Sequence, residues 1–357
     1  MTAEIEILEP VDRVRLKFRD PEAISEVSDP IHRDLSTAAR AGQALFVSCD
    51  ETAGVDRLIP TRKGWGKHEH FGLGEIFDLP DGPEGEMDIE GLAVDDGWLW
   101  IVGSHSLKRD KPDEEDGRAK ALRRMARLKR DPNRAFLGRV PLAMRDGVPV
   151  PVARDGKRRA ACLRLFEDRS KLKHWLRGDP HVGPFLDIPS KENGLDIEGI
   201  EVRGTRIWLG LRGPVLREHG IVLELDLKVT KRGWLKARRI DGRARYRKHL
   251  ICTQGQGIRD LAFDGDDLMI LTGTVMTGDG PSDIWRWRDA VGAQVSGLKP
   301  VEHVANMPYR GEVDHPEGLV RWPEGGGNAW LVVYDSPSDD RLHGDAAKVD
   351  ADVMRLT

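Results

Sequence analysis

Acidic pairs recur along the chain in one local context. The tetrapeptide Asp-Ile-Glu-Gly begins at Asp88 and again at Asp196, each time ahead of an apolar run that contains a turn and a Trp. Side chains at i and i+2 of an extended segment point the same way, so each pair presents two carboxylates on one side. Carboxylates that converge in a partly desolvated place need a cation, a basic side chain or raised pKa values.

Calcium is the cation that suits such a group best, because it accepts several oxygen ligands in flexible geometry. The candidate metal ligands are Asp88, Glu90, Asp196, Glu198 and Glu317, the last from a His-Pro-Glu-Gly copy of the motif. Against a metal, the sequence has no EF-hand loop. The structural alternative is that these acids hydrogen-bond backbone amides where a strand starts, with the Gly needed for close approach.

A second set of polar residues follows the strand that comes after each motif. If that strand returns to the same end, its last residues line the same site; they are Asp50, Glu51, Ser104, His105, Arg212, Thr274 and Asp335. His105, Arg212 and Glu198 are the candidate catalytic residues, with His105 as a general base or metal ligand. The candidate substrate-binding residues are Arg212, Arg259, Asp335 and Ser104, which suit a small anionic ester or phosphate.

Alternatives stay open for these residues. A loop histidine is often only solvated, and Arg212 and Arg259 would also serve simply to neutralise the acids. The sequence contains no GxSxG, HExxH, P-loop or dinucleotide-binding motif, so no cofactor other than a divalent cation is expected.

The elements that position these residues are repeated. Copies of the motif and its hairpin start at residues 34, 88, 196, 257 and 315. Units of this size with four short strands each are typical of propeller blades. The sequence therefore predicts an all-β fold, a β-propeller with five four-stranded blades, or six as the alternative. A bulky residue recurs in the second strand of each copy and is expected in the core: Phe46, Trp100, Trp208, Met269 and Trp330.

The long interval between the copies that start at residues 88 and 196 is interpreted as one blade with an insertion. Residues 134–142 and 185–190 are the expected third and fourth strands, and residues 118–131 and 166–179 have helical patterns. The basic, partly helical insertion at 106–180 contains 22 Lys and Arg against 11 Asp and Glu. It is interpreted as a lid, as a patch that binds a protein or an anionic partner, nucleic acid included, or as a merely solvated face.

The two ends of the chain are expected to meet. The N-terminal strand at 11–18 can close the ring with the C-terminal blade, so that 1–357 forms a single domain without free sheet edges. No run is long and apolar enough to span a membrane, and the first residues lack the layout of a signal peptide. A cytoplasmic location and no membrane partner are therefore expected.

The DIEG- and HPEG-led hairpins, with IWLGLRGP (207–214) and HPEGLVRWPEGG (315–326), resemble a bacterial family described as domain of unknown function 3616. The resemblance covers roughly residues 30–357. More distantly, the repeated D-x-E-G pattern is similar to propeller proteins described as phytase esterase-like. That likeness implies a propeller and, weakly, ester or phosphoester hydrolysis with a metal held by Asp88, Glu90, Asp196, Glu198 and Glu317. The chain departs from it in lacking a secretory signal and in having Arg259 where an acid belongs.

Two functions follow from the sequence and are ranked almost level. The first is a metal-dependent ester or phosphoester hydrolase that acts at the acidic mouth of the central channel. The second is a non-catalytic propeller that binds a protein or an anionic partner, because propellers host unrelated functions on one scaffold.

Overall fold

Antiparallel series of four strands build most of the computed structural model, which describes residues 7–19, 30–113, 115–167, 170–276, 278–344 and 346–356. The first series runs β2 (Thr37–Ala41), β3 (Ala44–Ser48), β4 (Gly54–Thr61) and β5 (Gly64–Gly72). The second runs β6 (Ile89–Asp95), β7 (Trp98–Gly103), β10 (Leu137–Arg145) and β11 (Val148–Pro151). The expected all-β class is confirmed.

The later series repeat this order. The third comprises β15 (Asp196–Arg203), β16 (Arg206–Leu216), β17 (His219–Val229) and β19 (Tyr246–Cys252). The fourth comprises β20 (Gly257–Asp264), β21 (Asp267–Gly273), β22 (Asp283–Trp287) and β24 (Glu302–Asn306). The fifth comprises β25 (His315–Arg321), β26 (Ala329–Asp335), β28 (Ala346–Arg355) and β1 (Asp12–Lys17).

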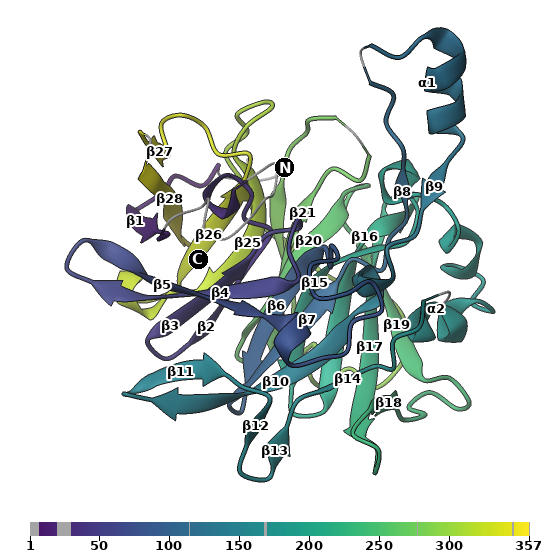
Figure 1. Cartoon of the computed structure of the whole chain (residues 1–357), viewed down its shortest axis with the longest axis horizontal. Coiled ribbons are helices and arrows are strands. Elements are labelled where there is room, and N and C mark those ends of the chain that lie inside the picture. The colour runs from purple at the N-terminus through teal and green to yellow at the C-terminus, as the bar shows by residue number, and fades with distance from the viewer. Residues whose placement is uncertain are drawn as a thin grey trace.

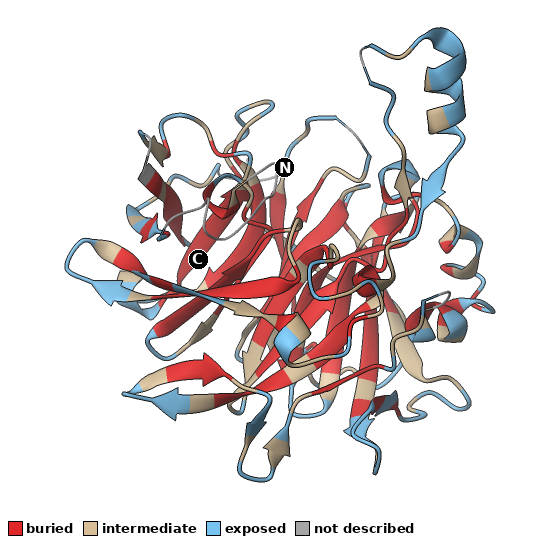
Figure 2. Ribbon diagram, viewed as in Figure 1, coloured by how far each residue is buried: buried red, intermediate tan, exposed pale blue. Residues whose placement is uncertain are grey.

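The first strand of each series lies against the first strands of two others. The contacts run in a cycle from β2 to β6, β15, β20, β25 and back to β2, and these strands lie together near the centre of Figure 1. Figure 2 shows that they are largely buried, whereas the outer hairpins are exposed at their tips. The motif-bearing strands are therefore arranged around one axis.

The bulky residues of the second strands occupy the core, as expected. They are at most 1% exposed: Phe46, Trp100, Trp208, Met269 and Trp330. Each belongs to a cluster of buried apolar side chains that joins neighbouring series. Such aromatic packing supplies much of the burial that holds the series together.

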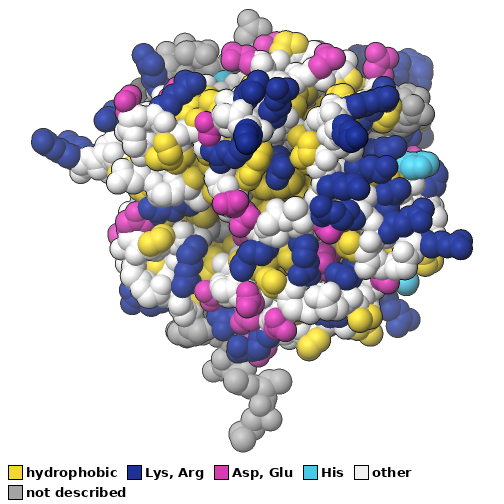
Figure 3. Space-filling model, turned by 90° about the horizontal axis from the view of Figure 1, so that it is seen from below, with side chains coloured by type: hydrophobic (Ala, Val, Ile, Leu, Met, Phe, Trp, Pro, Cys, Tyr) yellow, Lys and Arg dark blue, Asp and Glu magenta, His cyan; other side chains and the backbone are white. Residues whose placement is uncertain are grey.

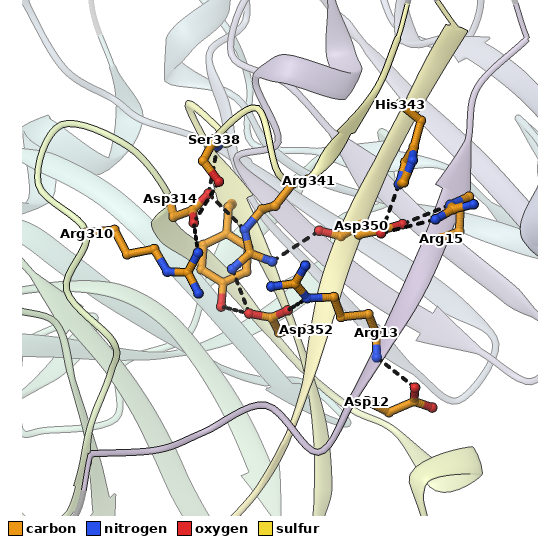
Figure 4. A network of polar contacts seen from close by, with 11 residues as sticks. Asp12, Arg13, Arg15, Arg310, Asp314, Ser338, Arg341, His343, Asp350 and Asp352 are labelled. Atoms are coloured by element: carbon orange, nitrogen blue, oxygen red, sulfur yellow. Dashed lines mark hydrogen bonds and ion pairs between the residues drawn. The ribbon is translucent and has the colours of Figure 1, made fainter.

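The N-terminal strand β1 pairs antiparallel with β28, so chain segments from both ends share one sheet. A network of ion pairs and hydrogen bonds also joins side chains of these two strands (Figure 4). Arg15 binds Asp350 at 3.0 Å, and Arg13 binds Asp352 at 3.2 Å. The buried Arg341 donates to Asp352 at 2.6 Å. A parallel contact between β1 and β5 also connects this series to the first one.

The second series differs from the prediction in its last strand. Residues 185–190 form no strand; the chain there contains the 3-10 turns η4 (Gly183–Phe185) and η5 (Ser190–Glu192). The fourth strand is instead β11, which pairs with β10 across an Asp-Gly turn at 146–147. Both turn residues have positive φ, which is typical of a two-residue hairpin.

The helices in the segment 106–180 are shorter than the sequence pattern indicates. Helix α1 (Arg118–Met125) has no buried residue and projects from the molecule in Figure 1. Helix α2 (Lys171–Leu176) is capped at its N-terminus by Ser170, whose side chain accepts a hydrogen bond from the Lys173 amide. None of the helices in the described part of the chain is long and apolar enough to cross a membrane.

The remaining elements are short. They are the strands β8 (Lys108–Arg109), β9 (Leu128–Lys129), β12 (Arg154–Asp155), β13 (Arg158–Arg159), β14 (Ala161–Cys162), β18 (Leu235–Ala237), β23 (Gly297–Lys299) and β27 (Leu342–His343), and the 3-10 turns η1 (Ile31–Arg33), η2 (Leu73–Glu75), η3 (Pro132–Ala135) and η6 (Pro323–Gly325).

Candidate functional site

A β-bulge recurs at the same motif position in the second to fifth series. The pairing register shifts around Glu90, Glu198, Arg259 and Glu317, so each is left out of the ladder between its first and second strands. A bulge bends its strand and redirects the side chain of the extra residue. The third position of the repeated motif, a Glu in three series and Arg259 in the fourth, therefore coincides with a bulge that presents this residue near the axis.

The glycine of the motif is required by close approach of the next innermost strand. A Cβ on Gly91 would lie 2.8 Å from Ile200 Cγ2 and 3.1 Å from the Glu198 carbonyl oxygen. A Cβ on Gly318 would lie 3.0 Å from the Ala38 amide nitrogen. A side chain at either position would force neighbouring strands apart.

Arg259 lies between two of the motif acids. Its Nη1 donates to Glu198 Oε2 at 3.0 Å and to Glu317 Oε1 at 2.7 Å, and its Nη2 donates to the Thr274 carbonyl at 3.0 Å. Arg259 is only 8% exposed. Burial lowers the pKa of Arg259, but the charges of Glu198 and Glu317 more than compensate and raise it above its usual range. The guanidinium is thus a built-in cation for these carboxylates.

Arg212 neutralises the same side of the site. Its Nη1 lies 3.0 Å from Glu198 Oε1 and 3.7 Å from Asp196 Oδ2. Its Nε donates to the Val275 carbonyl at 3.1 Å. Despite Arg212, burial and the charge of Glu198 raise the pKa of Asp196 to about 8.

The second series has its own arginine, which the sequence did not single out. Arg134 lies in η3, is 2% exposed, and donates to Asp88 Oδ1 at 3.0 Å and to the Ser106 hydroxyl at 2.7 Å. It also binds Glu86. Burial raises the pKa of Asp88 to about 6, a rise that Arg134 and a hydrogen bond from Ser104 limit. Nothing in the local sequence around Arg134 distinguishes it from the other arginines of this basic segment.

Glu90 is the acid without a partner. No hydrogen bond or ion pair joins its carboxyl to any other described residue, in contrast to Glu198 and Glu317. Burial raises the pKa of Glu90 well above its usual range, and the charges of Asp88, Glu198 and Asp196 raise it further. Glu90 therefore faces the acids of two series from the bulge of β6.

Glu317 has a raised pKa as well. Burial is the largest cause and lifts it to about 8, with Glu198 and Asp335 adding to the rise and Arg259 opposing it. Asp335 accepts a hydrogen bond from the Ser336 hydroxyl at 3.0 Å. A small cavity of about 30 Å³, lined in part by Arg259, His315 and Glu317, borders this side of the site.

His105 does not join the acids. Its Nε2 lies 3.2 Å from the Phe136 carbonyl and must donate there, so its Nδ1 accepts from the Ser170 hydroxyl at 3.1 Å. Burial and the nearby Lys173 lower the pKa of His105 to about 3. Both ring nitrogens are engaged in structural contacts, and the geometry does not support the predicted role as a general base or metal ligand.

Asp260, which follows Arg259, has the structural role considered for the motif acids. Its carboxylate accepts from the Leu319 and Leu261 amides, both at 2.8 Å, and so joins β20 to β25. Glu201 does the same between β15 and β20 by accepting from the Phe263 amide at 3.0 Å. The acids thus divide into those that join strands and those that face the axis.

The predicted calcium site does not fit the arrangement of the described residues. Among them there is no group of three or more His, Cys, Asp or Glu placed to hold a metal ion. Glu198 and Glu317 have guanidinium partners instead, and Asp88 has Arg134. The need for a cation, argued from the sequence, is met here by arginines and by raised pKa values.

Comparison with known proteins identifies the family. Residues 34–352 match the family described as "Protein of unknown function (DUF3616)", and the chain belongs to it. The resemblance drawn from the DIEG- and HPEG-led hairpins is confirmed. No curated protein matches the chain.

Several solved structures are similar over most of their length. Glutaminyl cyclase from Myxococcus xanthus is 10% identical, with 98% of each chain covered and a TM-score of 0.42. A PQQ-bound aldose sugar dehydrogenase from Streptomyces coelicolor is 11% identical, with 96% of this chain and 99% of that one covered and a TM-score of 0.36. The β-propeller domain of Myceliophteria thermophila Cps50 (Swd1) is 9% identical, with 90% and 84% covered and a TM-score of 0.31.

Proposed function

We propose that the chain is a five-bladed β-propeller that binds a small ligand with a positively charged group at the mouth of its axis. The cycle of first strands supports the blade count, with each four-stranded series as one blade. On this proposal β1 closes the ring by completing the last blade, and 1–357 is one domain. A cytoplasmic location stays a prediction.

The observation that carries the ligand class is the unpaired Glu90. Its carboxyl faces Asp88, Asp196 and Glu198, and their charges disfavour its ionisation. A cation brought to Glu90 would relieve this repulsion, because an opposite charge nearby favours the ionised carboxylate. Arg259, held between Glu198 and Glu317, is an internal example of the group the site accepts.

An anionic ligand suits this site less well. The predicted anion-binding residues Arg212 and Arg259 already bind carboxylates, so a phosphate or carboxylate would have to displace an internal partner. Such a buried pair is costly to break on one side. The small anionic substrate expected from the sequence is therefore the less favoured ligand.

The proposal is tested by calorimetric titration with methylguanidine, n-butylamine, CaCl2 and MnCl2 at low ionic strength. We expect millimolar binding of methylguanidine or n-butylamine, as is usual for so few contact atoms, and no tighter binding of Ca²⁺ or Mn²⁺, for which the described residues form no site. The Glu90→Gln variant should lose it, whereas Glu324→Gln, an exposed acid bound to Arg40, should not. No binding by the parent chain, or equal binding by Glu90→Gln, would refute the proposal.

The second candidate is the ester or phosphoester hydrolase, for which the phytase esterase-like resemblance is the sequence argument. The observation that favours it is the raised pKa of Asp196, about 8, beside Arg212. A carboxyl protonated at neutral pH can donate a proton to a leaving group. Turnover of a p-nitrophenyl ester or phosphate panel, lost in Asp196→Asn and Glu198→Gln, is the test; no turnover by the parent chain would eliminate this candidate.

The structure gives less support than the sequence to a binding role for the helical part of the 106–180 segment. Many of its cations have acidic partners within the chain, as in Arg124 with Asp116 and Arg130 with Asp187. Arg109 binds Glu192 outside the segment. Around α1 this internal pairing favours a self-complementary attachment over a free patch for a protein or an anionic partner.

A further inference from the structure

A second basic region lies outside that segment, where β17 continues into β18. Residues 228–248 contain ten Lys and Arg against a single acid, Asp241. The turn between the two strands is closed by the Thr230 and Gly233 amides and presents Lys231 and Arg232 at its tip. The hairpin therefore concentrates positive charge on a short, exposed projection.

Two lysines of this hairpin lie directly opposite each other. The antiparallel register pairs Lys228 of β17 with Lys236 of β18, and both side chains are exposed. Directly opposed residues of an antiparallel pair point to the same face, and like charges there destabilise the hairpin. Folding alone gives no reason for this pair, whereas a bound anion between the two lysines would.

A neighbouring hairpin, which belongs to the 106–180 segment, has the same arrangement. In β12 and β13, Arg154 lies opposite Arg159, and both are exposed. The chain leaves β13 through β14 to Leu163, which forms a parallel bridge with Leu235 of β18. The two hairpins are thus held next to each other by buried backbone and apolar contacts.

Arg238 binds Asp226, but nine other exposed cations of this region have no acidic partner among the described residues. We call them, with the two hairpins, the basic hairpin surface. They are Arg154, Lys157, Arg159, Lys228, Lys231, Arg232 and Lys236 in the hairpins, and Arg239 and Arg243 directly after β18. Figure 3 views the molecule from below, the side of β12, β13 and β18, and shows Lys and Arg gathered across this face.

An aromatic side chain lies among these cations. Trp234 directly precedes β18 and is 36% exposed, which is unusual beside the fully buried Trp100, Trp208 and Trp330. Cations that follow a phosphate backbone, together with an aromatic face on which a base can stack, are the features of single-strand nucleic-acid binding. An Arg side chain also matches phosphate geometry with two parallel donors.

We propose that the basic hairpin surface binds single-stranded nucleic acid, with phosphates at the opposed cation pairs and a base on Trp234. This is independent of the ligand at the axis. The probe is a fluorescein-labelled 20-nucleotide oligothymidylate or oligouridylate, and the measurement is fluorescence anisotropy over a series of salt concentrations.

The parent chain should bind the oligonucleotide with an affinity that falls steeply with salt. In Lys228→Gln/Lys236→Gln the slope of log affinity against log salt should fall by about 1.4, since each phosphate contact on a single strand contributes about 0.7. Affinity itself should fall about tenfold in low salt, because two phosphate contacts are lost. Trp234→Ala should weaken binding at least about fivefold through lost stacking.

The matched control is Arg118→Gln/Arg123→Gln, which removes the same charge from the exposed helix α1 and should bind as the parent does. Because the lysine pair is repulsive, its double variant should melt no lower than the parent chain. Arg154→Gln/Arg159→Gln provides an independent test on the second hairpin. The proposal is overturned if the parent chain does not bind, if control and hairpin variants lose affinity equally, or if vesicles containing phosphatidylserine bind this surface and oligonucleotides do not.

Discussion

Replacing Arg259 by Met removes the cation that lies between Glu198 and Glu317. Both contacts are short, 3.0 and 2.7 Å, and Arg259 is 8% exposed, so solvent screens them little. Removing one partner of a buried ion pair costs about 3–5 kcal/mol, because the remaining charge is left uncompensated. We therefore expect the free energy of unfolding of Arg259→Met to fall by about that amount at pH 9, where Glu317, with a pKa of about 8, is mostly ionised.

Urea unfolding followed by circular dichroism measures this change. The loss should shrink as the pH falls below about 8, because Glu317, with a pKa of about 8, then becomes protonated and tolerates burial. The triple variant Arg259→Met/Glu198→Gln/Glu317→Gln should recover most of the stability, since neutral amides leave no unpaired charge. A loss below about 1 kcal/mol, or no recovery in the triple variant, would refute the view that Arg259 is the internal cation of the site.

Three further predictions follow from the same contacts. Asp196 has a pKa of about 8 against an ordinary 3.8, so the stability that its protonated form contributes is present in acid and is lost as pH rises from about 4 to 8. The melting temperature of Asp196→Asn should therefore decline less over that pH range than that of the parent chain, and an equal decline would contradict this. Gly318→Ala should lower the free energy of unfolding by about 1–3 kcal/mol through overpacking, whereas Gly72→Ala, which meets no atom within 4 Å, should have little effect in the same urea experiment. His105→Gln should lower the melting temperature but leave cation binding at the axis unchanged; lost binding with an intact fold would restore a functional role to His105.

The repeat was the part of the fold that the sequence predicted best. Apolar hairpins at regular intervals and a bulky residue in each second strand follow from burial, and burial depends on local composition. The last strand of the second series was predicted at the apolar stretch 185–190, whereas the structure has it at 148–151. The Asp-Gly turn at 146–147 was the signal that identifies the correct hairpin.

The candidate site was only partly predictable. Convergence of the motif acids follows from the repeat, but the bulge at Glu90, Glu198, Arg259 and Glu317 depends on how neighbouring strands pack. Arg259 was noted as a departure from the acidic pattern, and its role became clear from its distances to two carboxylates. The role of Arg134 as a partner of Asp88 could not be predicted from the sequence, because a buried arginine from a distant loop has no local sequence pattern.

His105 illustrates a different limit. It follows a motif strand at the place where a site residue was expected, yet its backbone has φ of 56° and its ring binds Ser170 and the Phe136 carbonyl. The direction of a side chain at a strand end depends on one backbone dihedral, which the residue type does not determine.

The proton balance of cation binding tests the central claim about Glu90 most directly. Methylguanidine is titrated calorimetrically at pH 7 in phosphate and in the zwitterionic buffer ACES, whose ionisation enthalpies differ strongly and neither of which is a free alkylammonium ion. If Glu90 is protonated in the free protein and ionises on binding, the observed heats should differ between the buffers by the equivalent of about one proton released per ligand. The difference should vanish in Glu90→Gln. Binding with equal heats in both buffers would contradict the account.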